Sequence, residues 1–480
     1  MNINPLAPEW LAVPADADDL DPRIWSGGIA RSRSGELTVA GVAATALAAE
    51  FGTPLYVIDE QDARDRAALI RDAFDREFAR VGSSARVYYA GKAFLSTAVV
   101  RWMTEAGLGI DVCSGGELAV ALAGGADPAH IGYHGNNKSP AEIDRAVEVG
   151  VGAIVIDSVI EVARVADAAL RHGRRQAVRL RVNTGVHAHT HEYLATARED
   201  QKFGIPLADV PAVVDEIRAT GLLDLLGLHS HIGSQIFDLS GFEEAARRLL
   251  AVHAELLAGG EVPELNLGGG FGIAYTAADH PTPVAEIARR FADVVAREAR
   301  RLGIPVPIVA IEPGRSIIGP AGLTLYAVGT VKDVEVTAVE ESWVSPDDGT
   351  GHRGMTWLRR YLSVDGGMSD NIRPALYGAD YSVRMANRAS AAAPVLVRVA
   401  GKHCESGDIV VHADYLPGDA GVGDLLAVPA TGAYCWSLAS NYNYLGRPAV
   451  VAVRDSHARV IVRGETEADL LSRDTGIGES

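Results

Sequence analysis

Several side chains that can carry out covalent or acid–base chemistry stand directly after short apolar runs of this 480-residue chain. Lys92 follows the run Val87–Ala90, a glycine-rich segment occupies 268–272, and the sequence Glu-Pro-Gly-Arg runs from Glu312 to Arg315. A primary amine can form a Schiff base with a carbonyl group. A glycine-rich loop lets backbone N–H groups approach an anion, and a guanidinium can hold a phosphate or a carboxylate by paired hydrogen bonds. These functions require a scaffold that brings the three segments together.

Eight short runs rich in Val, Ile and Leu recur along the first two thirds of the chain, mostly separated by segments with helical periodicity. Eight parallel strands close a (β/α)8 barrel of the TIM type, whose active site lies at the carboxyl ends of the strands. The predicted strands are Val87–Ala90, Gly109–Val112, His130–Tyr133, Ala153–Ile156, Val178–Val182, Leu225–His229, Glu264–Leu267 and Ile308–Ile311. The predicted helices include Ser96–Ala106, Ser114–Ala123, Ser139–Val149, Ser158–His172 and Pro283–Leu302, several of which begin at a residue suited to capping.

After about Gly319 the pattern changes to alternating β-type runs, which predict a mainly antiparallel β domain. These runs include 324–334, 362–365, 394–400 and 450–462. Leu55–Asp59 is strand-like but precedes the barrel series, so we expect it to join the β domain. The predicted domains are a barrel over 52–320 and a discontinuous β domain over 1–51 and 321–480. The segment 345–355, rich in Asp and Gly, predicts an insertion, and we expect the last fifteen or so residues to be unstructured.

Composition excludes several classes of partner. The formal charge is −18 and the pI is about 5.2, which opposes binding to nucleic acid or to anionic lipid. We find no apolar stretch of membrane-spanning length and no signal-peptide pattern, so we expect a cytoplasmic protein that acts on a small molecule. Three cysteines, Cys113, Cys404 and Cys435, are too few for a disulfide framework and lack metal-type spacing.

The barrel prediction places the candidate groups at one rim and suggests a cofactor. Lys92 follows the first strand, while the glycine-rich segment and Glu312 follow the seventh and eighth strands, where barrels often bind phosphate. A phosphorylated aldehyde, pyridoxal 5'-phosphate (PLP), fits an amine and a phosphate loop at such a rim. Glu312 can then pair with the ring nitrogen, because an adjacent carboxylate favours the protonated pyridinium.

The sequence His229-Ser230-His231 after the sixth strand leaves more than one interpretation open. His231 can stack on a cofactor ring, which we favour, or the histidine pair can bind a metal or pack in the core. A metal site needs further ligands, and the chain offers no clean set besides His187, His189 and His191 in one loop. We therefore predict no metal cofactor.

A series of seven motifs resembles the fold-type III PLP-dependent decarboxylases and, among them, the diaminopimelate decarboxylases. The resemblance spans about Leu55 to Asn443, and Gly91 departs from it because relatives often carry a larger or charged residue there. It implies an alanine racemase-like fold, a barrel with a β domain. The motifs, in chain order, are Tyr89–Ala93, Asp111–Ser114, His231–Gln235, Gly268–Gly272, Glu312–Arg315, Cys404–Asp408 and Gly432–Tyr434.

The resemblance implies decarboxylation of meso-2,6-diaminopimelate to L-lysine, the last step of lysine biosynthesis. Lys92 and Cys404 are implied as catalytic residues, the cysteine as a proton donor. Cofactor contacts are implied for Lys92, Asp111, His231, Ser234, Gly270, Glu312, Gly314, Arg315 and Tyr434. Substrate contacts are implied for Arg315, Arg373, Tyr377, Glu405 and Tyr434.

The resemblance further implies a homodimer with shared active sites, in which Cys404 and Glu405 serve the neighbouring subunit. Whether Cys113 and Cys404 bond across subunits stays open. The alternatives are a related decarboxylase for another amino acid, a barrel racemase, a non-catalytic PLP-binding protein, and a metal-dependent hydrolase. An arginine at the distal end of the substrate, Arg373, disfavours a simple diamine-forming decarboxylase such as one for ornithine.

Overall fold

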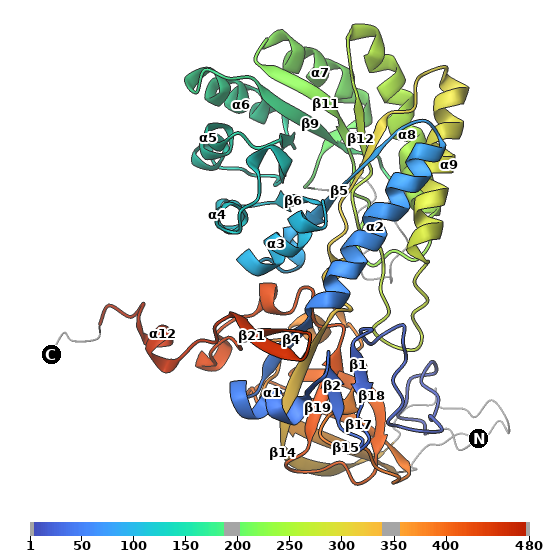
Figure 1. Cartoon of the computed structure of the whole chain (residues 1–480), viewed down its shortest axis with the longest axis vertical. Helices are drawn as coiled ribbons and strands as arrows, with labels where there is room; N and C mark the ends of the chain where they lie inside the picture. Colours follow the sequence, from blue (N-terminus) through green and yellow to red (C-terminus); the bar gives the residue numbers. More distant parts are fainter. Residues whose placement is uncertain (1–3, 187–201, 338–355, 477–480) are drawn as a thin grey trace. The chain divides into compact units, whose positions relative to one another are not determined.

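The computed structural model describes residues 4–186, 202–337 and 356–476 (Figure 1). The chain forms two compact units, each built from more than one segment. One unit contains 63–273 and 281–318, and the other contains 1–62, 274–280 and 319–480. We refer to them as the barrel unit and the β unit.

The barrel unit holds a closed sheet of eight parallel strands. Each strand pairs with its neighbour in parallel, and the ring closes where β8 (Ala153–Ile156) pairs with β9 (Gln176–Asn183). A two-residue strand, β10 (Ile205–Pro206), adds to β9. The predicted (β/α)8 fold is therefore confirmed. The barrel strands are β5 (Ala85–Ala90), β6 (Gly109–Val112), β7 (Ile131–Tyr133), β8 (Ala153–Ile156), β9 (Gln176–Asn183), β11 (Leu223–His229), β12 (Glu264–Asn266) and β13 (Ile308–Ile311).

Helices surround the barrel strands (Figure 1). Ser96, Ser114 and Ser139 each accept a hydrogen bond from a backbone N–H of the first helical turn, as their types predict. Ser158 occupies the same position before its helix but makes no such bond. The helices are α2 (Glu60–Arg80), α3 (Thr97–Glu105), α4 (Gly115–Ala123), α5 (Pro140–Val149), α6 (Val159–Arg171), α7 (Val210–Ala219), α8 (Ser240–Leu256), α9 (Val284–Leu302) and the short α10 (Arg315–Ile318).

The interior of the barrel contains a buried ion pair between Arg179 of β9 and Glu264 of β12, with an N···O distance of 2.8 Å. Both side chains are about 1% exposed, so both charges are almost completely desolvated and depend on each other for neutralisation. Arg179 also donates to the Tyr88 hydroxyl at 2.9 Å, and Arg86 adds a second cation next to Glu264. No motif in the sequence marks this network.

The β unit is built on a large, mainly antiparallel sheet. Strand β4 (Leu55–Asp59) pairs with β14 and β20, so this early segment is part of that sheet, as its strand-like pattern predicted, although the predicted barrel bounds of 52–320 include it. The parallel pairs are β4 with β20 and β15 with β17. The remaining strands of this sheet are β14 (Gly322–Thr337), β15 (Thr356–Val364), β16 (Arg384–Met385), β17 (Pro394–Ala400), β18 (Ile409–Pro417), β19 (Leu425–Pro429), β20 (Val450–Arg454) and β21 (His457–Val462). A small sheet of β1 (Ile29–Arg31), β2 (Leu37–Val39) and β3 (Val42–Ala43), and the helices α1 (Ala44–Phe51), α11 (Arg373–Tyr377) and α12 (Glu467–Leu471), complete the unit.

The C-terminal part has the predicted β structure at 450–462 but not the predicted unstructured end. The run 450–462 forms two strands, because Asp455 and Ser456 both adopt positive φ and turn the chain into a hairpin without glycine. The polar C-terminal residues include helix α12, which begins with a capping box between Thr466 and Asp469. The predicted insertion at 345–355 lies outside the described residues.

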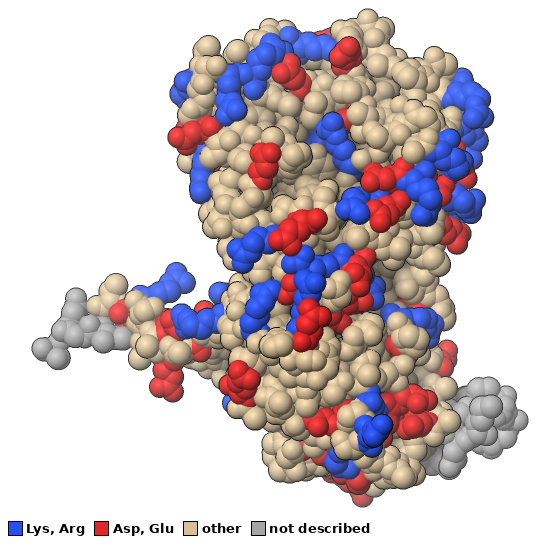
Figure 2. All heavy atoms as spheres, viewed as in Figure 1, with Lys and Arg blue, Asp and Glu red and all other residues tan. Residues whose placement is uncertain are grey.

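No helix in the described part of the chain is long and apolar enough to cross a membrane. On the face that Figure 2 shows, acidic and basic side chains are interspersed rather than gathered into a patch of one sign. This distribution gives that face no extended basic surface of the kind that binds nucleic acid.

Candidate active site

The carboxyl ends of the barrel strands carry a cluster of ionisable side chains. Lys92 lies exposed on the 3-10 turn Gly91–Ala93 directly after β5, and Asp111 lies buried on β6. His134 follows β7, His229 ends β11, and Glu312 follows β13. Since the ends of parallel barrel strands meet at one rim, residues 220 positions apart in sequence are gathered there.

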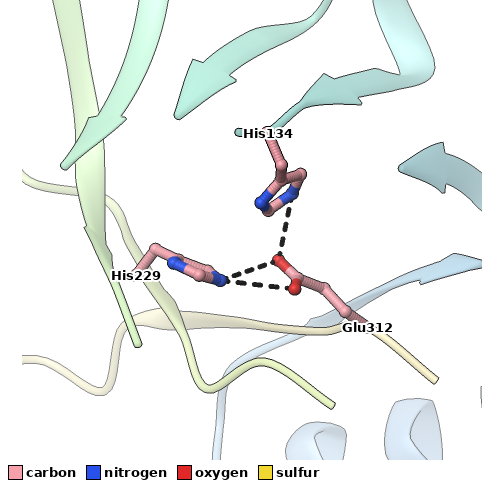
Figure 3. Close-up of side chains that lie close together, drawn as sticks. All are labelled: His134, His229 and Glu312. Carbon is pink, nitrogen blue, oxygen red and sulfur yellow. Dashed lines mark hydrogen bonds and ion pairs between the residues drawn. The ribbon is translucent and has the colours of Figure 1, made fainter. Parts of the chain in front are cut away.

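Glu312 lies at the centre of this cluster (Figure 3). Its carboxylate is 3.2 and 3.3 Å from Nε2 of His229 and 3.4 Å from Nε2 of His134. Asn266, the last residue of β12, donates from Nδ2 to Oε1 of Glu312 at 2.7 Å. His134 also approaches Oδ1 of Asp111 at 3.2 Å. The carboxylate is thus fixed from three strands.

The pKa values of the two carboxyl groups of the cluster are shifted in opposite directions. Burial and the nearby charge of Glu312 raise the pKa of Asp111 well above its usual value. Burial opposes ionisation of Glu312 as well, but His229 and His134 outweigh it and hold the pKa of Glu312 well below its usual range. Burial lowers the pKa of His134 to about 4, so its imidazole is neutral at pH 7. Burial and neighbouring charges therefore favour ionisation of Glu312 over ionisation of Asp111.

The glycine-rich loop after β12 packs backbone against backbone with the loops on either side. A Cβ atom at Gly269 would lie 2.0 Å from the carbonyl oxygen of Glu312, and one at Gly270 would lie 2.2 Å from that of Gly233. Gly270 also has a φ of 107°, which disfavours side chains. Only glycine permits this approach, which gathers the backbone of three loops at one place. Phe271 anchors the loop by packing against aromatic rings of α2, α8 and α9.

Polar side chains of the same loops add hydrogen-bond donors of the types that bind anions. Arg315 donates from Nη2 to the hydroxyl of Ser234 at 2.9 Å, which joins the loop after β11 to the start of α10. Gly314 precedes Arg315, and a Cβ there would lie 2.9 Å from the carbonyl oxygen of Ala90 at the end of β5. Guanidinium, hydroxyl and backbone N–H groups are the donors that bind phosphate in proteins.

His231 lies beside both parts of the site. The backbone N–H of Gly269 donates to its Nδ1 at 3.5 Å, which places the imidazole against the glycine-rich loop. Burial and the adjacent positive charge of Lys92 lower the pKa of His231 well below its usual value. The charge of Lys92 also acts on Asp111 and His134, so the amine lies near the carboxyl cluster.

The predicted site residues of the β unit lie on α11 and on separate turns. Arg373 and Tyr377 begin and end α11, yet Arg373 is 6% exposed whereas Tyr377 is 58% exposed. Cys404 and Glu405 are both exposed on one turn, and Tyr434 has a φ of 61°. The three cysteines of the chain are free thiols.

The turn that carries Cys404 and Glu405 is fixed by hydrogen bonds to the buried side of its backbone. The backbone N–H groups of His403 and Met368 donate to the two carboxylate oxygens of Asp408 at 2.7 and 2.6 Å. The buried His403 ring contacts Ser369 through Nε2 at 2.8 Å. The exposed thiol and carboxylate are therefore presented from a fixed backbone.

The chain resembles known proteins over nearly its whole length. Residues 67–319 match the family model described as pyridoxal-dependent decarboxylase, pyridoxal binding domain. Diaminopimelate decarboxylase of Mycobacterium tuberculosis is 50% identical over 461 residues, which cover 94% of this chain and 98% of that protein. The chain belongs to the diaminopimelate decarboxylase family. The Bacillus subtilis member is 42% identical over 448 residues, covering 92% and 96% of the two chains.

Solved structures of the family agree with this assignment. The diaminopimelate decarboxylase from M. jannaschii superposes with a TM-score of 0.82 at 30% identity, covering 94% of this chain and 98% of that one. The enzyme from Helicobacter pylori, solved with L-lysine, gives a TM-score of 0.77 at 26% identity, covering 89% and 98%. The residues matched by the family model nearly coincide with the barrel unit.

The barrel unit fits the PLP that the family uses. The group has a phosphate, an aldehyde and a ring nitrogen, and the rim offers a glycine-rich loop with Ser234 and Arg315, the amine of Lys92, and the anionic Glu312. Both carboxylate oxygens of Asp111 are buried without a hydrogen bond, so this side chain keeps hydrogen-bonding capacity for a further polar group.

His134, His229 and Glu312 also have donor types that bind metal ions, and their ligand atoms lie within 4.8 Å of one another. No second such group occurs in the residues that the structure describes. The three histidines weighed as metal ligands from the sequence, His187, His189 and His191, lie outside that part of the chain.

His134 and Asn266 were missed by the sequence analysis. Each is a single polar residue at a strand end, without a surrounding motif. Their position at the carboxyl end of a predicted barrel strand was the one available signal.

Proposed function

We propose that this chain catalyses the decarboxylation of meso-2,6-diaminopimelate to L-lysine and carbon dioxide, the last step of lysine biosynthesis. The observation that carries the proposal is the ring of Lys92, the glycine-rich loop and an anionic Glu312 at one barrel rim, in a chain half identical to known diaminopimelate decarboxylases. PLP, when bound, supplies an electron sink for the pair released as the C–C bond breaks.

The other steps of the proposed reaction are assigned to individual residues of the chain. Lys92 would supply the amine that holds the cofactor through its aldehyde. Glu312 keeps a proton at the ring nitrogen, because the anionic carboxylate favours the pyridinium. Cys404 returns a proton to the α carbon. His231 would stack on the cofactor ring, and the remaining residues that would hold the cofactor are Asp111, Ser234, Gly270, Gly314, Arg315 and Tyr434.

The distal end of the substrate is an amino acid group and needs receptors for an anion and a cation. We propose Arg373 with Tyr377 for the distal carboxylate and Glu405 for the distal ammonium, with Arg315 and Tyr434 as further substrate contacts. Opposite charges on these groups suit a zwitterionic end and disfavour a plain diamine.

We further propose a homodimer, acting in the cytoplasm, in which the β unit completes the active site. Cys404 and Glu405 are exposed in the single chain, as residues offered to a neighbouring subunit must be. Exposed apolar side chains of α11 and of residues 436–444 support this proposal: Leu376, Tyr377, Leu438, Tyr442 and Tyr444. A sedimentation measurement at several protein concentrations tests the dimer.

The reaction is tested by carbon dioxide release from a panel containing meso-diaminopimelate, L-lysine, L-ornithine and L-arginine. We expect release from meso-diaminopimelate and its loss in Lys92→Ala. Borohydride treatment followed by peptide mapping should fix the cofactor at Lys92. Release from another amino acid alone would favour a related decarboxylase, and cofactor binding without release from any substrate would favour a non-catalytic PLP protein.

A further inference from the structure

Arg373 is a buried cation without an anionic partner. Arg373 is 6% exposed, and the groups that act most strongly on its guanidinium are Tyr275, Tyr381 and Cys435; among the described residues it forms no ion pair with a carboxylate. A buried guanidinium is costly unless it is paired. Arg179 in the barrel illustrates the usual solution, because Glu264 neutralises it at 2.8 Å.

Two tyrosines take the place of the missing carboxylate. The guanidinium carbon of Arg373 lies 4.6 Å from the ring centre of Tyr275 and 5.7 Å from that of Tyr381. The same guanidinium donates from Nη1 to the Tyr381 hydroxyl at 2.9 Å. Aromatic faces attract a cation and a hydroxyl accepts one of its five N–H groups, but neither neutralises the charge. The positive charge therefore stays available for an anion.

The two rings are themselves fixed. Tyr275 and Tyr381 are 5% and 1% exposed, and their rings meet edge to face at 5.0 Å. Ser382 donates from its backbone N–H and its hydroxyl to the carbonyl oxygen of Tyr275, at 3.2 and 3.0 Å. The Tyr381 hydroxyl also lies 3.7 Å from the thiol of Cys435. Side chains locked in this way can hold a guanidinium in one orientation.

We propose that Tyr275 and Tyr381 are positioning residues that hold Arg373 uncompensated for the distal carboxylate of the ligand, and so set the preference for a ligand that carries this group. The inference rests on the proposed function and goes beyond it by naming what prepares the anion receptor. A carboxylate side chain beside Arg373 would compete with the ligand for its guanidinium. Tyrosines orient the guanidinium without neutralising its charge.

L-lysine and cadaverine are suitable probes because they differ only in the carboxylate that Arg373 would bind. Each is titrated into the PLP-loaded protein, and the change in cofactor absorbance gives a dissociation constant. In Tyr381→Phe, which keeps the ring and removes the hydroxyl, we expect roughly fivefold to tenfold weaker binding of L-lysine and unchanged binding of cadaverine. Tyr275→Leu, which removes an aromatic face, should give a loss of roughly threefold to tenfold with the same selectivity.

Tyr415→Phe is the matched control. Tyr415 is a buried tyrosine of the same unit, 3% exposed, and packs in a separate cluster with Leu396 and Ala413. We expect it to leave both dissociation constants unchanged. Circular dichroism melting tests whether each variant is folded. Tyr275→Leu provides an independent test if Tyr381→Phe does not fold.

Equal weakening of both ligands in the two tyrosine variants would overturn the inference, because a purely structural role affects them alike. Unchanged L-lysine binding in both would overturn it as well. Arg373→Ala separates this failure from that of the proposed function. If Arg373→Ala weakens L-lysine selectively while the tyrosine variants do not, the carboxylate receptor stands and only the positioning role fails. If Arg373→Ala has no effect, the receptor assignment itself is wrong.

Discussion

Asn266 joins two parts of the candidate active site through a single amide. It is fully buried at the end of β12, donates to Glu312 at 2.7 Å, and accepts from the backbone N–H of Gly268 at 2.9 Å. One amide group thus orients the carboxylate assigned to the ring nitrogen and fixes the first residue of the loop assigned to the phosphate. Removal of this amide should therefore weaken cofactor binding both at the ring nitrogen and at the phosphate.

The change Asn266→Ala removes one hydrogen bond to a charged group and one between neutral groups. Typical net contributions are about 2 kcal/mol and about 1 kcal/mol, so we expect the free energy of unfolding to fall by about 3 kcal/mol. If about half of this free energy reflects the orientation of Glu312 and the loop, the dissociation constant for PLP rises roughly tenfold. Urea unfolding measures the first quantity, and titration of the cofactor-free protein with PLP measures the second.

Asn387 offers a control with the same bonding pattern in the β unit. It donates to Asp424 at 2.9 Å and accepts from the backbone N–H of Leu425 at 3.2 Å. Asn387→Ala should lower stability without changing PLP affinity. A PLP dissociation constant within twofold of the wild-type value in Asn266→Ala would refute the reasoning, as would equal weakening in the two variants.

Two further predictions concern stability. Burial lowers the pKa of His253 on α8 from 6.5 to about 4. Between about pH 6.5 and pH 4, this histidine is therefore protonated in the unfolded chain but neutral in the folded chain. Stability therefore falls as pH falls through this window, and His253→Leu should reduce the loss in unfolding free energy between pH 7 and pH 5 by about 2 kcal/mol, measured by urea unfolding. Glu264→Gln leaves Arg179 buried without its anion and should cost about 3 to 5 kcal/mol, whereas the double variant Arg179→Met, Glu264→Leu should recover most of it; equal stability of the single and double variants would contradict this account.

The barrel was predictable because each of its strands is a short apolar run between helical segments. Runs such as Ala153–Ile156 are buried on both faces, so they appear in the sequence as continuous Val- and Ile-rich stretches. The turn at Asp455 and Ser456 was not predictable in this way. Neither residue is glycine, and their positive φ values depend on the pairing of β20 with β21.

Motifs identified only part of the cluster around Glu312. Glu312 stands in a recognisable Glu-Pro-Gly-Arg sequence, but His134 and Asn266 are 178 and 46 positions away from it and carry no motif of their own. Their contact with Glu312 exists only because the sheet closes into a ring. Sequence spacing cannot report such contacts, whereas the order of strands around the barrel can.

The two buried arginines show a stricter limit. Arg179 and Arg373 both adjoin apolar residues in the sequence, and nothing local tells which one has an internal partner. Arg179 meets Glu264 across the barrel, so its charge is satisfied within the fold. Arg373 meets two tyrosine rings, so no anion within the described residues neutralises its charge, which is the basis for proposing it as a ligand receptor. A buried charge therefore indicates function only once its surroundings are known, and it is the absence of a carboxylate, within the described residues, that separates a receptor from a structural pair.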